Sequence, residues 1–585
     1  MPTTTERNLL LYNRILLFVA GLGGLLYGID VGIIGGALPY LEATSHLTPG
    51  QLSIIVAAVL LGSVFSTLFA GLLADWMGRK PLMIVSGTAF VLSIPVIALS
   101  ASYESLFLGR LLQGCSAGLV GIVVPLYLAE CLPASQRGRG TAVFQWLLTL
   151  GIFVAAVIGI YYSYHVAEIE RTAPQILNEV KDHAWRRIFW MSMPPGILFV
   201  LGGFFVSESP RWLFRKGRKP AALEALRRSR TEDQATVEMG EMEQVARESA
   251  GRGQVRAQRD SLLQRRYIVP FLLACVILSC NTATGINSVI GFNTNILLQS
   301  GLADVSAHWG YVVFTFCNFL FTIVGMTLVD RKGRKFLFTV GTAGIIVAHL
   351  CTGVMFIRSE AHRYDAREAI QAMVAPDQSL DFRYDDASAQ RLLPAGEFGN
   401  ERTSLAVIYS YGDFTGTTTP VRTGEGGGAA VAIKRSEGVP AGKVQAFFSN
   451  PFADLDAART APLKIEHAYI SPVPSTGNGW LMALFLYMFV AFYASGPGVC
   501  VWLALSELMP TRIRSNGMSV ALVINQLVST TLAAVFLPMV GKYGYSRMFF
   551  LFAGFTVVYL LTVAFFLPET KGKTLEEIEK HFERV

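Results

Sequence analysis

Charged side chains are scarce in this chain. Asp, Glu, Lys and Arg make up 16% of its 585 residues, whereas soluble proteins average about 25%. Hydrophobic residues make up 52%, so the composition favours a membrane protein over a soluble one. The formal net charge of +7 could suggest a nucleic-acid partner. However, Lys and Arg cluster in short loops between apolar runs, which is the pattern of membrane topology, and we expect no nucleic acid.

The chain also lacks cysteines at the spacing of metal ligands. Its seven cysteines lie in or beside apolar runs, and we interpret them as small buried hydrophobic residues. No Ser/His/Asp set, metal cluster or phosphate-binding loop is present, so we expect neither an enzyme nor a cofactor. The first apolar run is too long for a cleaved signal peptide.

Long apolar runs dominate what is present. A helix that spans a bilayer needs about 20 apolar residues, and the chain offers twelve such runs. They start near residues 14, 50, 82, 105, 138, 186, 267, 308, 336, 480, 514 and 545. Most are rich in Gly and Ala, which let membrane helices approach closely. The sequence therefore predicts an all-α membrane protein with twelve transmembrane helices.

The charged loops set the expected topology. They follow the even-numbered runs, so the positive-inside rule places them and both termini in the cytoplasm of a multi-pass cell-membrane protein. The expected units begin with an N-terminal six-helix half (1–206) and a cytoplasmic helical linker (207–266). The first three helices of a C-terminal half (267–357), an extracytoplasmic insert (358–478) and the last three helices with a short tail (479–585) follow.

Residues 358–478 interrupt the pattern of spans. Alternating stretches such as "SLAVIYSYGDF", "AAVAIKRS" and "KIEHAYIS", separated by Gly, Pro and Asp, predict a small β-rich domain. A partly disordered loop is the alternative. The segment has no cysteines, so any fold there depends on its own core. Because twelve spans can close a pathway without it, we expect it to be dispensable for basic transport.

The chain repeats itself. "GLLADWMGRKPL" is matched by "GMTLVDRKGRKFL", and "LAECLPASQR" is matched by "LSELMPTRIR". Asp75 and Glu130 are 55 positions apart (130 − 75), and Asp330 and Glu507 are 177 apart (507 − 330). The excess of 122 equals the length of the insert to within one residue. The sequence thus predicts two parallel copies of six helices, which is a transporter architecture.

Seven motifs together resemble those of the sugar porters of the major facilitator superfamily. They are "GLLADWMGRKP", "PLYLAECLPASQRGRG", "SESPRWLFRKGR", "TGIN", "VDRKGRK", "GPGVCVW" and "LPETKGKTLEEIE". The resemblance covers nearly the whole chain except 358–478. The animal glucose facilitators and the bacterial proton-coupled sugar carriers are similar in the same places. The resemblance implies the two-repeat major facilitator fold and transport by alternating access.

The resemblance also implies a sugar site. Amides suit sugars because each offers a donor and an acceptor to hydroxyl groups, and an aromatic ring can cover an apolar sugar face. The alternatives are helix–helix contacts for a lone Asn and core packing for the Trp. The expected substrate-binding residues are Tyr27, Gln145, Asn281, Thr282, Asn287, Asn318, Trp502 and Gln526.

Two departures from the family pattern affect this site. Asn281 and Thr282 stand where relatives carry two glutamines, which implies a wider pocket. Gly291 and Phe292 stand where a tyrosine pair is usual, which implies a weaker outer gate or one that lacks a hydroxyl. These departures put the identity of the substrate in doubt.

Asp30 is the one charge in "GGLLYGIDVGIIGGALPY". A charge at the centre of a span costs about 2.5–3.5 kcal/mol on insertion scales and normally faces a partner or a cavity. Arg110 on the fourth span is the expected partner, because both residues fall in the outer half of their spans. The proton-coupled bacterial sugar carriers resemble this arrangement, which implies proton coupling. A structural ion pair is the alternative.

Charged residues at the cytoplasmic helix ends form an expected latch. Exposed ion pairs contribute only about 0–1 kcal/mol each, so a network of them could bias a two-state equilibrium without freezing it. Topology signal and solubility are the alternative explanation. The expected latch residues are Asp75, Arg79, Glu130, Arg137, Glu208 and Arg211, mirrored by Asp330, Arg334, Glu507, Arg514 and Glu569.

These features predict a monomeric secondary transporter of a monosaccharide or polyol, embedded in a lipid bilayer and working by sugar:proton symport. One alternative is an uncoupled sugar facilitator. Another is a non-transporting sugar sensor, against which the short segment after "PETKG" argues.

Overall fold

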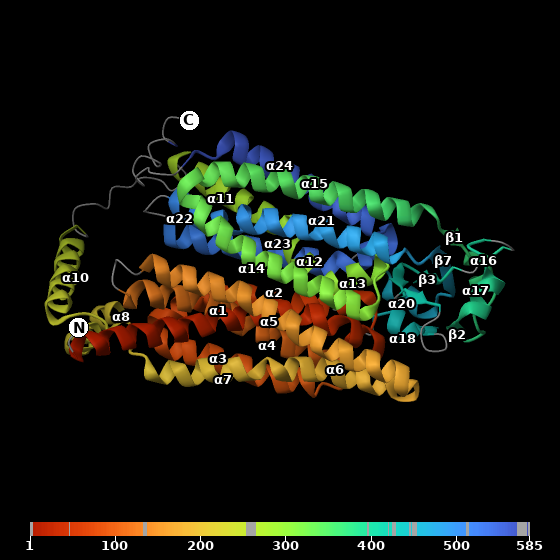
Figure 1. The fold of residues 1–585 in the computed structure, drawn as a ribbon, viewed down its shortest axis with the longest axis horizontal. Helices are drawn as coiled ribbons and strands as arrows, with labels where there is room; N and C mark the ends of the chain where they lie inside the picture. Colours follow the sequence, from red (N-terminus) through yellow and green to blue (C-terminus); the bar gives the residue numbers. More distant parts are fainter. Residues whose placement is uncertain are drawn as a thin grey trace.

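The computed structural model shows a bundle of long helices with a small β-rich unit at one end (Figure 1). The residues that the structure describes are 4–45, 47–132, 137–252, 265–394, 397–399, 401–418, 420–423, 429–440, 442–443, 446, 453–509, 514–569 and 582. Among them, twelve helical segments are long and apolar enough to cross a membrane. The predicted all-α membrane fold with twelve spans and a β-containing insert is therefore confirmed.

The first six spans form the N-terminal half. Ser and Thr caps open α2 and α4, where Thr48 and Ser102 accept hydrogen bonds from the N–H groups of Gln51 and Ser105. The sixth span is broken at Ser192 into two helices. The helices are α1 (Thr4–Thr44), α2 (Pro49–Met77), α3 (Arg79–Ala98), α4 (Tyr103–Cys131), α5 (Arg137–Thr172), the 3₁₀ helix η2 (Pro174–Ile176), α6 (Leu177–Met191) and α7 (Met193–Phe205).

Three helices follow in the linker: α8 (Pro210–Arg215), α9 (Lys219–Arg227) and α10 (Glu232–Arg252). Trp212 and Leu213 of α8 pack with Ala222 and Ala225 of α9 in a small core of their own. The linker is thus an ordered helical unit over its described residues.

The second six spans form the C-terminal half, in which two spans are interrupted. Gly285 adopts a positive φ of 83° between α11 and α12, and Gly496 with Pro497 separates α21 from α22. Both breaks fall in motifs singled out in the sequence, "TGIN" and "GPGVCVW". The helices are α11 (Arg265–Ala283), α12 (Ile286–Gly291), α13 (Asn293–Gln299), α14 (Asp304–Lys332), α15 (Arg334–Ala361), α21 (Thr476–Ser495), α22 (Pro497–Leu508), α23 (Arg514–Tyr543) and α24 (Tyr545–Phe566).

The insert lies between α15 and α21. Strands β1 (Tyr364–Asp365), β7 (Leu463–Pro472), β3 (Thr403–Tyr411) and β4 (Phe414–Thr417) are neighbours in that order, β5 (Val421–Arg422) also pairs with β3, and β2 (Leu380–Tyr384) pairs with β6 (Ala429–Ile433). All pairings are antiparallel. The short helices are α16 (Arg367–Gln371), α17 (Asp386–Leu392), α18 (Arg435–Gly438) and α20 (Leu455–Thr460).

The expected core of the insert is present. Leu405 and Val407 of β3, with Ile465 and Ile470 of β7, are buried among apolar residues of the same unit. The prediction of a β-rich insert is therefore confirmed.

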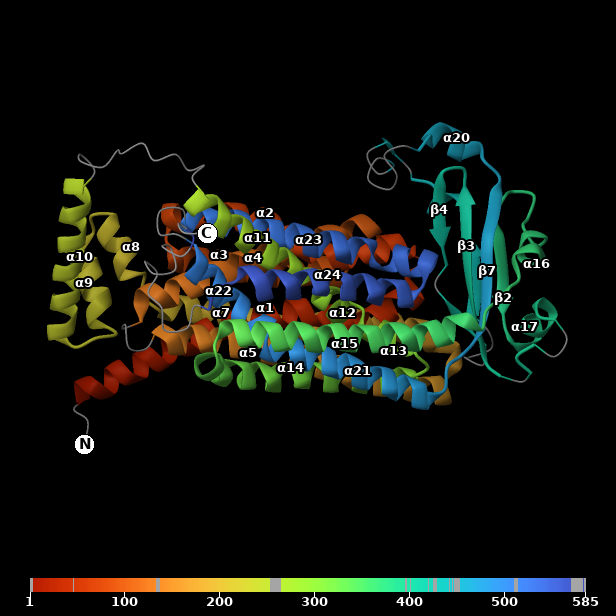
Figure 2. The same ribbon diagram turned by 90° about the horizontal axis from the view of Figure 1, so that it is seen from above.

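The two halves lie side by side in Figure 1, and Figure 2 shows the insert at one end of the bundle and the linker at the other. We call these the insert end and the linker end. Helix α1 begins and α24 ends at the linker end (Figure 1). Along the middle, α5 and α14 meet through Phe153 and Phe316, whose ring centroids are 5.6 Å apart.

The buried cores differ between the two ends. At the insert end, one apolar core joins α1 and α2 of the N-terminal half to α12, α13 and α23 of the C-terminal half. Within it, Phe292 stacks on Phe536 with ring centroids 4.6 Å apart. Towards the linker end, the described apolar residues form two separate cores, one in each half. The halves are thus packed together at the insert end and packed independently at the linker end.

Candidate functional site

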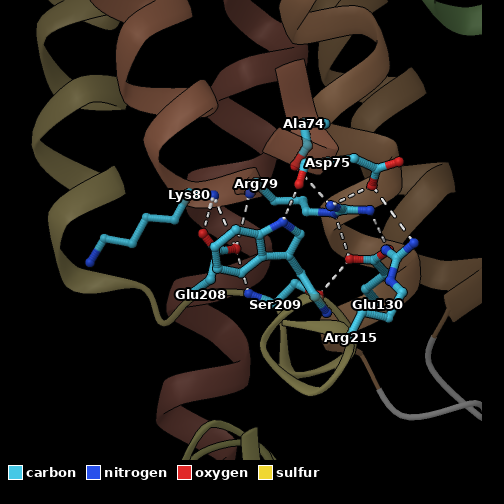
Figure 3. Close-up of polar contacts among 9 residues, drawn as sticks. Ala74, Asp75, Arg79, Lys80, Glu130, Glu208, Ser209 and Arg215 are labelled. Atoms are coloured by element: carbon cyan, nitrogen blue, oxygen red, sulfur yellow. Dashed lines mark hydrogen bonds and ion pairs between the residues drawn. The ribbon is translucent and has the colours of Figure 1, made fainter. Parts of the chain in front are cut away.

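A cluster of ionic groups ties together helix ends of the N-terminal half at the linker end (Figure 3). Arg79 is 2% exposed. Its Nη2 donates to Glu130 Oε1 at 3.0 Å, and its Nε lies 2.8 Å from Oε2 of the same carboxylate. Asp75 Oδ1 lies 3.0 Å from Arg79 Nη1. This two-point contact between a buried guanidinium and a carboxylate fixes the start of α3 against the end of α4.

Glu208 caps the N-terminus of α3 in the same cluster (Figure 3). Its carboxylate accepts hydrogen bonds from the backbone N–H groups of Arg79 at 3.1 Å and Lys80 at 3.3 Å. The preceding Gly78 has a φ of 104°, and a Cβ there would lie 2.3 Å from Glu208 Oε2. Burial raises the pKa of Glu208, although these hydrogen bonds oppose the shift.

Two members of this cluster were not expected from the sequence. Ser209 donates its hydroxyl to Glu130, and Arg215 Nη2 donates to Glu130 Oε1 at 3.2 Å. The expected Arg211 is exposed and makes no ion pair among the described residues. Arg215 lies one helical turn further along α8, so the spacing of α8 relative to α4 decides which arginine reaches the carboxylate.

The C-terminal half repeats the capping arrangement. Glu569 accepts hydrogen bonds from the N–H groups of Arg334 and Lys335, both at 3.2 Å, at the start of α15. Gly333 precedes them with a φ of 90°. The side chains of the other expected latch residues in this half, together with Arg137, lie outside the described residues: Asp330, Glu507 and Arg514.

Asp30 and Arg110 are both 1% exposed, on α1 and α4. Neither oxygen of Asp30 has a hydrogen-bond partner among the described residues. Arg110 donates from Nη1 to Gln113 at 2.6 Å and lies over the ring of Phe189, 5.6 Å from its centroid. The ion pair expected between Asp30 and Arg110 is therefore not formed in this structure.

Polar side chains cluster around the break between α11 and α12. Asn281 Nδ2 donates to Tyr493 Oη at 3.1 Å, and Asn287 Nδ2 donates to Ser529 Oγ at 2.6 Å. The Oδ1 atom of Asn281 is buried and has no partner in the described part of the chain. Broken membrane helices commonly build substrate sites because their free ends offer polar groups inside the bundle.

Of the other expected substrate residues, Thr282 lies beside the break, and the structure gives Gln145 and Asn318 no contact with it among the described residues. Thr282 donates to Asn525 O at 3.4 Å, and the Tyr27 hydroxyl faces Gln526 across the two halves. Asn318 is buried on α14, and Gln145 is half-buried on α5. The side chain of Trp502 lies outside the described residues. Tyr493 and Ser529 were missed because a Tyr and a Ser in apolar helices carry no distinctive pattern.

Hydrogen bonds close the insert end directly beneath the insert. Tyr311 donates its hydroxyl to Gly32 O at 2.8 Å, and Thr294 donates to Gly35 O at 2.7 Å. A Cβ on Gly35 would lie 2.8 Å from Ile290 O, so the glycine permits this close approach of α1 to the C-terminal half.

A second contact across the halves involves three polar side chains. Tyr40 donates its hydroxyl to Asp304 Oδ2 at 2.8 Å and stacks on His308 with ring centroids 5.4 Å apart. His308 Nε2 in turn lies 3.2 Å from Gly36 O. The glycines of α1 thus offer backbone carbonyls along one face, and α14 binds to them.

Comparison with known proteins identifies the scaffold. The family described as "Sugar (and other) transporter" matches residues 16–375 and 463–582. The chain belongs to this family. It is therefore a membrane transporter and not an enzyme. The match stops at 375 and resumes at 463, so most of the insert lies outside the family pattern.

Named relatives of this sugar-transporter chain fall in the same group. The human "Proton myo-inositol cotransporter" is 28% identical over 571 residues, covering 96% of this chain and 81% of the human protein. The "Glucose transporter GlcP" of Staphylococcus epidermidis is 25% identical, with 97% of each chain covered. The "Major myo-inositol transporter IolT" of Bacillus subtilis is 24% identical, covering 99% of this chain and 96% of the other.

Solved structures support the fold. The proton:xylose symporter XylE, bound to 6-bromo-6-deoxy-D-glucose, matches with a TM-score of 0.62 and 20% identity, covering 98% of this chain and 99% of XylE. The expected major facilitator fold of the sugar porters is confirmed.

Proposed function

We propose that this transporter carries a sugar or a polyol across the cell membrane together with protons, by alternating access. The observation that carries the proposal is the polar cluster at the broken span. Asn281 and Asn287 flank the Gly285 break deep in the bundle, and Tyr27 faces Gln526 from the other half. Amides and hydroxyls of both halves around one point suit a neutral polyhydroxyl substrate, because each can donate and accept.

The basic loops support an orientation with the linker end in the cytoplasm. "DWMGRKP" and "DRKGRK" join helices at that end, and short loops rich in Lys and Arg stay on the cytoplasmic side. Both termini are then cytoplasmic, and the insert faces the outside.

The packing of the cores supports an inward-facing state. One shared core holds the halves together at the insert end, whereas each half has its own core at the linker end. Alternating access requires this asymmetry to reverse during each cycle. The hydrogen bonds from Tyr311 and Thr294 to α1 must therefore break before the outside can open.

Asp30 is the proposed proton carrier. It is buried without a hydrogen-bond partner, and a charged carboxylate in such a place is costly, so a bound proton stabilises this state. We propose that Asp30 pairs with Arg110 after the proton leaves towards the cytoplasm. Proton binding from the outside then separates the pair and permits the closure that carries sugar inward.

In this proposal the described ionic contacts at the linker end hold helices together within a half, and they do not join one half to the other. They fix α2, α3, α4 and α8 to one another within the N-terminal half, through Arg79 and Glu130. Each half can then move as a rigid unit, which is the form of motion that alternating access needs.

An uptake assay in proteoliposomes tests the proposal. Pentoses, hexoses and inositols are screened with and without an imposed pH gradient, acidic outside. We expect uptake of at least one of them, and accumulation above the outside concentration only when the gradient is present. Uptake that equilibrates but never accumulates indicates an uncoupled facilitator, and no uptake of any of these compounds contradicts the proposal.

A further inference from the structure

A cavity of about 130 Å³ lies where the insert meets the insert end of the bundle. Its walls come from α1 and α2 of the N-terminal half, from α13, α15, α23 and α24 of the C-terminal half, and from the sheet of the insert. By this measure one water occupies about 10–15 Å³, so the cavity offers room for roughly ten waters, or one monosaccharide.

The sheet turns a polar face to this cavity. Side chains alternate along a strand, and alternate residues of β3 and β7 line the space: Ser404, Ala406, Tyr469 and Ser471. Pro472, the last residue of β7, also lines it. Ser404 pairs with Ser471 in the register of the sheet, and their hydroxyls are 3.1 Å apart. The residues between them on each strand, such as Leu405, point into the core of the insert. The cavity wall is therefore a row of small hydroxyl groups beside one aromatic ring.

The opposite wall carries a carboxylate and an amide. Glu42 at the end of α1 accepts a hydrogen bond from Asn295 Nδ2 on α13, which links the two halves. Asn295 is 7% exposed and lines the cavity, and its Oδ1 has no partner among the described residues. A buried acceptor without a partner is costly unless water or a ligand supplies a donor.

Charges and rings complete the site. Glu360 in the last turn of α15 and Arg363, two residues after that helix, form an ion pair of 3.3 Å. The Arg363 guanidinium lies 5.5 Å from the centroid of the Tyr469 ring. Phe356 stacks on Tyr545, with ring centroids 4.8 Å apart, on the bundle side. Two acids and one base leave no excess of positive charge for an anion, and the walls hold many more hydroxyls than charges.

We infer that this cavity is a second binding site for a neutral sugar or polyol, separate from the central site and built partly by the insert. The inference rests on the proposed function for the class of ligand. Amide, carboxylate and hydroxyl groups on several walls match a ligand that carries a hydroxyl on each carbon, and the Tyr469 ring can cover an apolar sugar face.

The position of the cavity gives such a site a role. It lies above the closed insert end, where Tyr311 and Thr294 bind α1. In the proposed orientation it therefore faces the outside while the central site faces the cytoplasm. A sugar can be held next to the pathway before the outside opens, and the insert, which the sequence suggested was dispensable for basic transport, becomes part of substrate capture.

Protection of an introduced thiol tests the inference. The seven native cysteines lie in membrane-spanning helices, so the full chain carrying Ser471→Cys should react with a small hydrophilic thiol reagent mainly in the cavity. D-glucose and myo-inositol serve as probes, with betaine at equal osmolality as the control. A probe at ten times its dissociation constant should slow labelling about tenfold. Thr460→Cys on α20, exposed and away from the cavity, should label at an unchanged rate.

Two further variants separate the cavity from the central site. Protection should persist when Asn287→Ala is added, because this change affects only the central site. Tyr469→Ala should raise the half-protecting concentration roughly two- to tenfold, whereas Tyr469→Phe, which keeps the ring, should not.

Uptake of both probes is measured in the same preparation. Uptake by the wild type without protection of the thiol, or protection that disappears with Asn287→Ala, overturns the second site and leaves the proposed function intact. Absence of both uptake and protection overturns the proposed function, and the second site with it.

Discussion

The two halves of the bundle have the same type of helix cap at the linker end, but their spans differ in the middle of the bundle. In each half a glutamate accepts hydrogen bonds from two N–H groups that open a helix, Glu208 at the start of α3 and Glu569 at the start of α15. A glycine with positive φ precedes each of these helices. The copies have thus kept the same device for joining helix ends, which is what a rigid half needs.

The same device occurs once more, at the insert end. Glu360 at the end of α15 accepts hydrogen bonds from the N–H and hydroxyl of Ser546 at the start of α24, directly after Gly544 with a φ of 88°. Within the C-terminal half, Glu360 of α15 therefore caps α24 at the insert end, and Glu569, three residues after α24, caps α15 at the linker end. Such reciprocity is what an inverted repeat of three helices inside the half would produce.

The middle of the two halves has diverged. In the N-terminal half, α1 and α4 are continuous and carry the buried charges Asp30 and Arg110. In the C-terminal half, breaks at Gly285 and Gly496 interrupt two spans, and the polar groups beside the first break are neutral. The comparison suggests a division of labour, with proton chemistry in the first half and substrate recognition mainly in the second.

The largest expected effect tests the role of the buried Asp30 in the N-terminal half. Asp30→Asn imitates a permanently neutral carboxyl group, so it should abolish accumulation against a gradient while sugar binding and exchange remain. Proteoliposomes with an imposed pH gradient provide the measurement, and counterflow without a gradient provides the control. If vesicles with this variant still concentrate sugar, Asp30 has only a structural role and the division between the halves fails.

The neutral half should give the opposite phenotype. Asn287→Ala or Gln526→Ala removes one hydrogen-bond partner of a sugar hydroxyl, which typically costs about 1–3 kcal/mol. Apparent affinity should therefore fall roughly 5- to 150-fold, while the dependence of accumulation on the pH gradient persists. Saturation curves for uptake measure the change, and unchanged affinity in both variants would remove these residues from the site.

A smaller effect tests the matching glutamate caps at the linker end of the two halves. Glu208→Ala and Glu569→Ala each leave two N–H groups at a helix start without their acceptor, and the loss of a helix cap costs about 0.5–2 kcal/mol. Both should lower the thermal unfolding temperature by similar amounts in detergent. A large drop for one variant and none for the other would show that only one half depends on this cap.

Glu208→Gln adds a pH dependence to that comparison. Burial raises the pKa of Glu208 above its ordinary value of 4.5, so the folded protein favours the neutral carboxyl. Protonation of Glu208 then contributes fully to stability below pH 4.5, and this contribution declines as the pH rises through the raised pKa. Relative to Glu208→Gln, the wild type should lose stability as the pH is raised from 4.5 in unfolding measurements.

The sequence was informative where a pattern is local. Apolar runs predicted the spans. The breaks at Gly285 and Gly496 were not predicted, although they fall in "TGIN" and "GPGVCVW". The sequence was less informative where the outcome depends on distances between helices. Arg215 rather than Arg211 reaches Glu130 because of how α8 sits on α4. Asp30 and Arg110, which the sequence analysis placed in the outer half of their spans, form no ion pair in this structure. Phe292, which suggested a weak gate, stacks on Phe536 in the closed end, a partner more than 200 positions away in the chain.

The smallest expected effect concerns the contact between the halves. Tyr311→Phe removes the hydroxyl that donates to Gly32 O at the insert end, while the ring remains. One hydrogen bond contributes about 0.5–1.5 kcal/mol, so the population with that end open should rise roughly two- to tenfold. Tyr487→Phe on α21 is the matched control, because the Tyr487 hydroxyl is buried without a partner in the described part of the chain.

Spin labels at Ala101→Cys and Ala303→Cys report this equilibrium. Both positions are exposed at the insert end, one in each half. The distance between the labels should shift towards longer values with Tyr311→Phe and stay unchanged with Tyr487→Phe. The hydrogen bond from Tyr311 to Gly32 O is present only when the insert end is closed. Tyr311→Phe should therefore change the populations of the closed and open states, while the distance between the spin labels in each state stays the same. Identical distributions for Tyr311→Phe and the parent would mean that the apolar core around Phe292 holds this end closed without help from the carbonyls of α1.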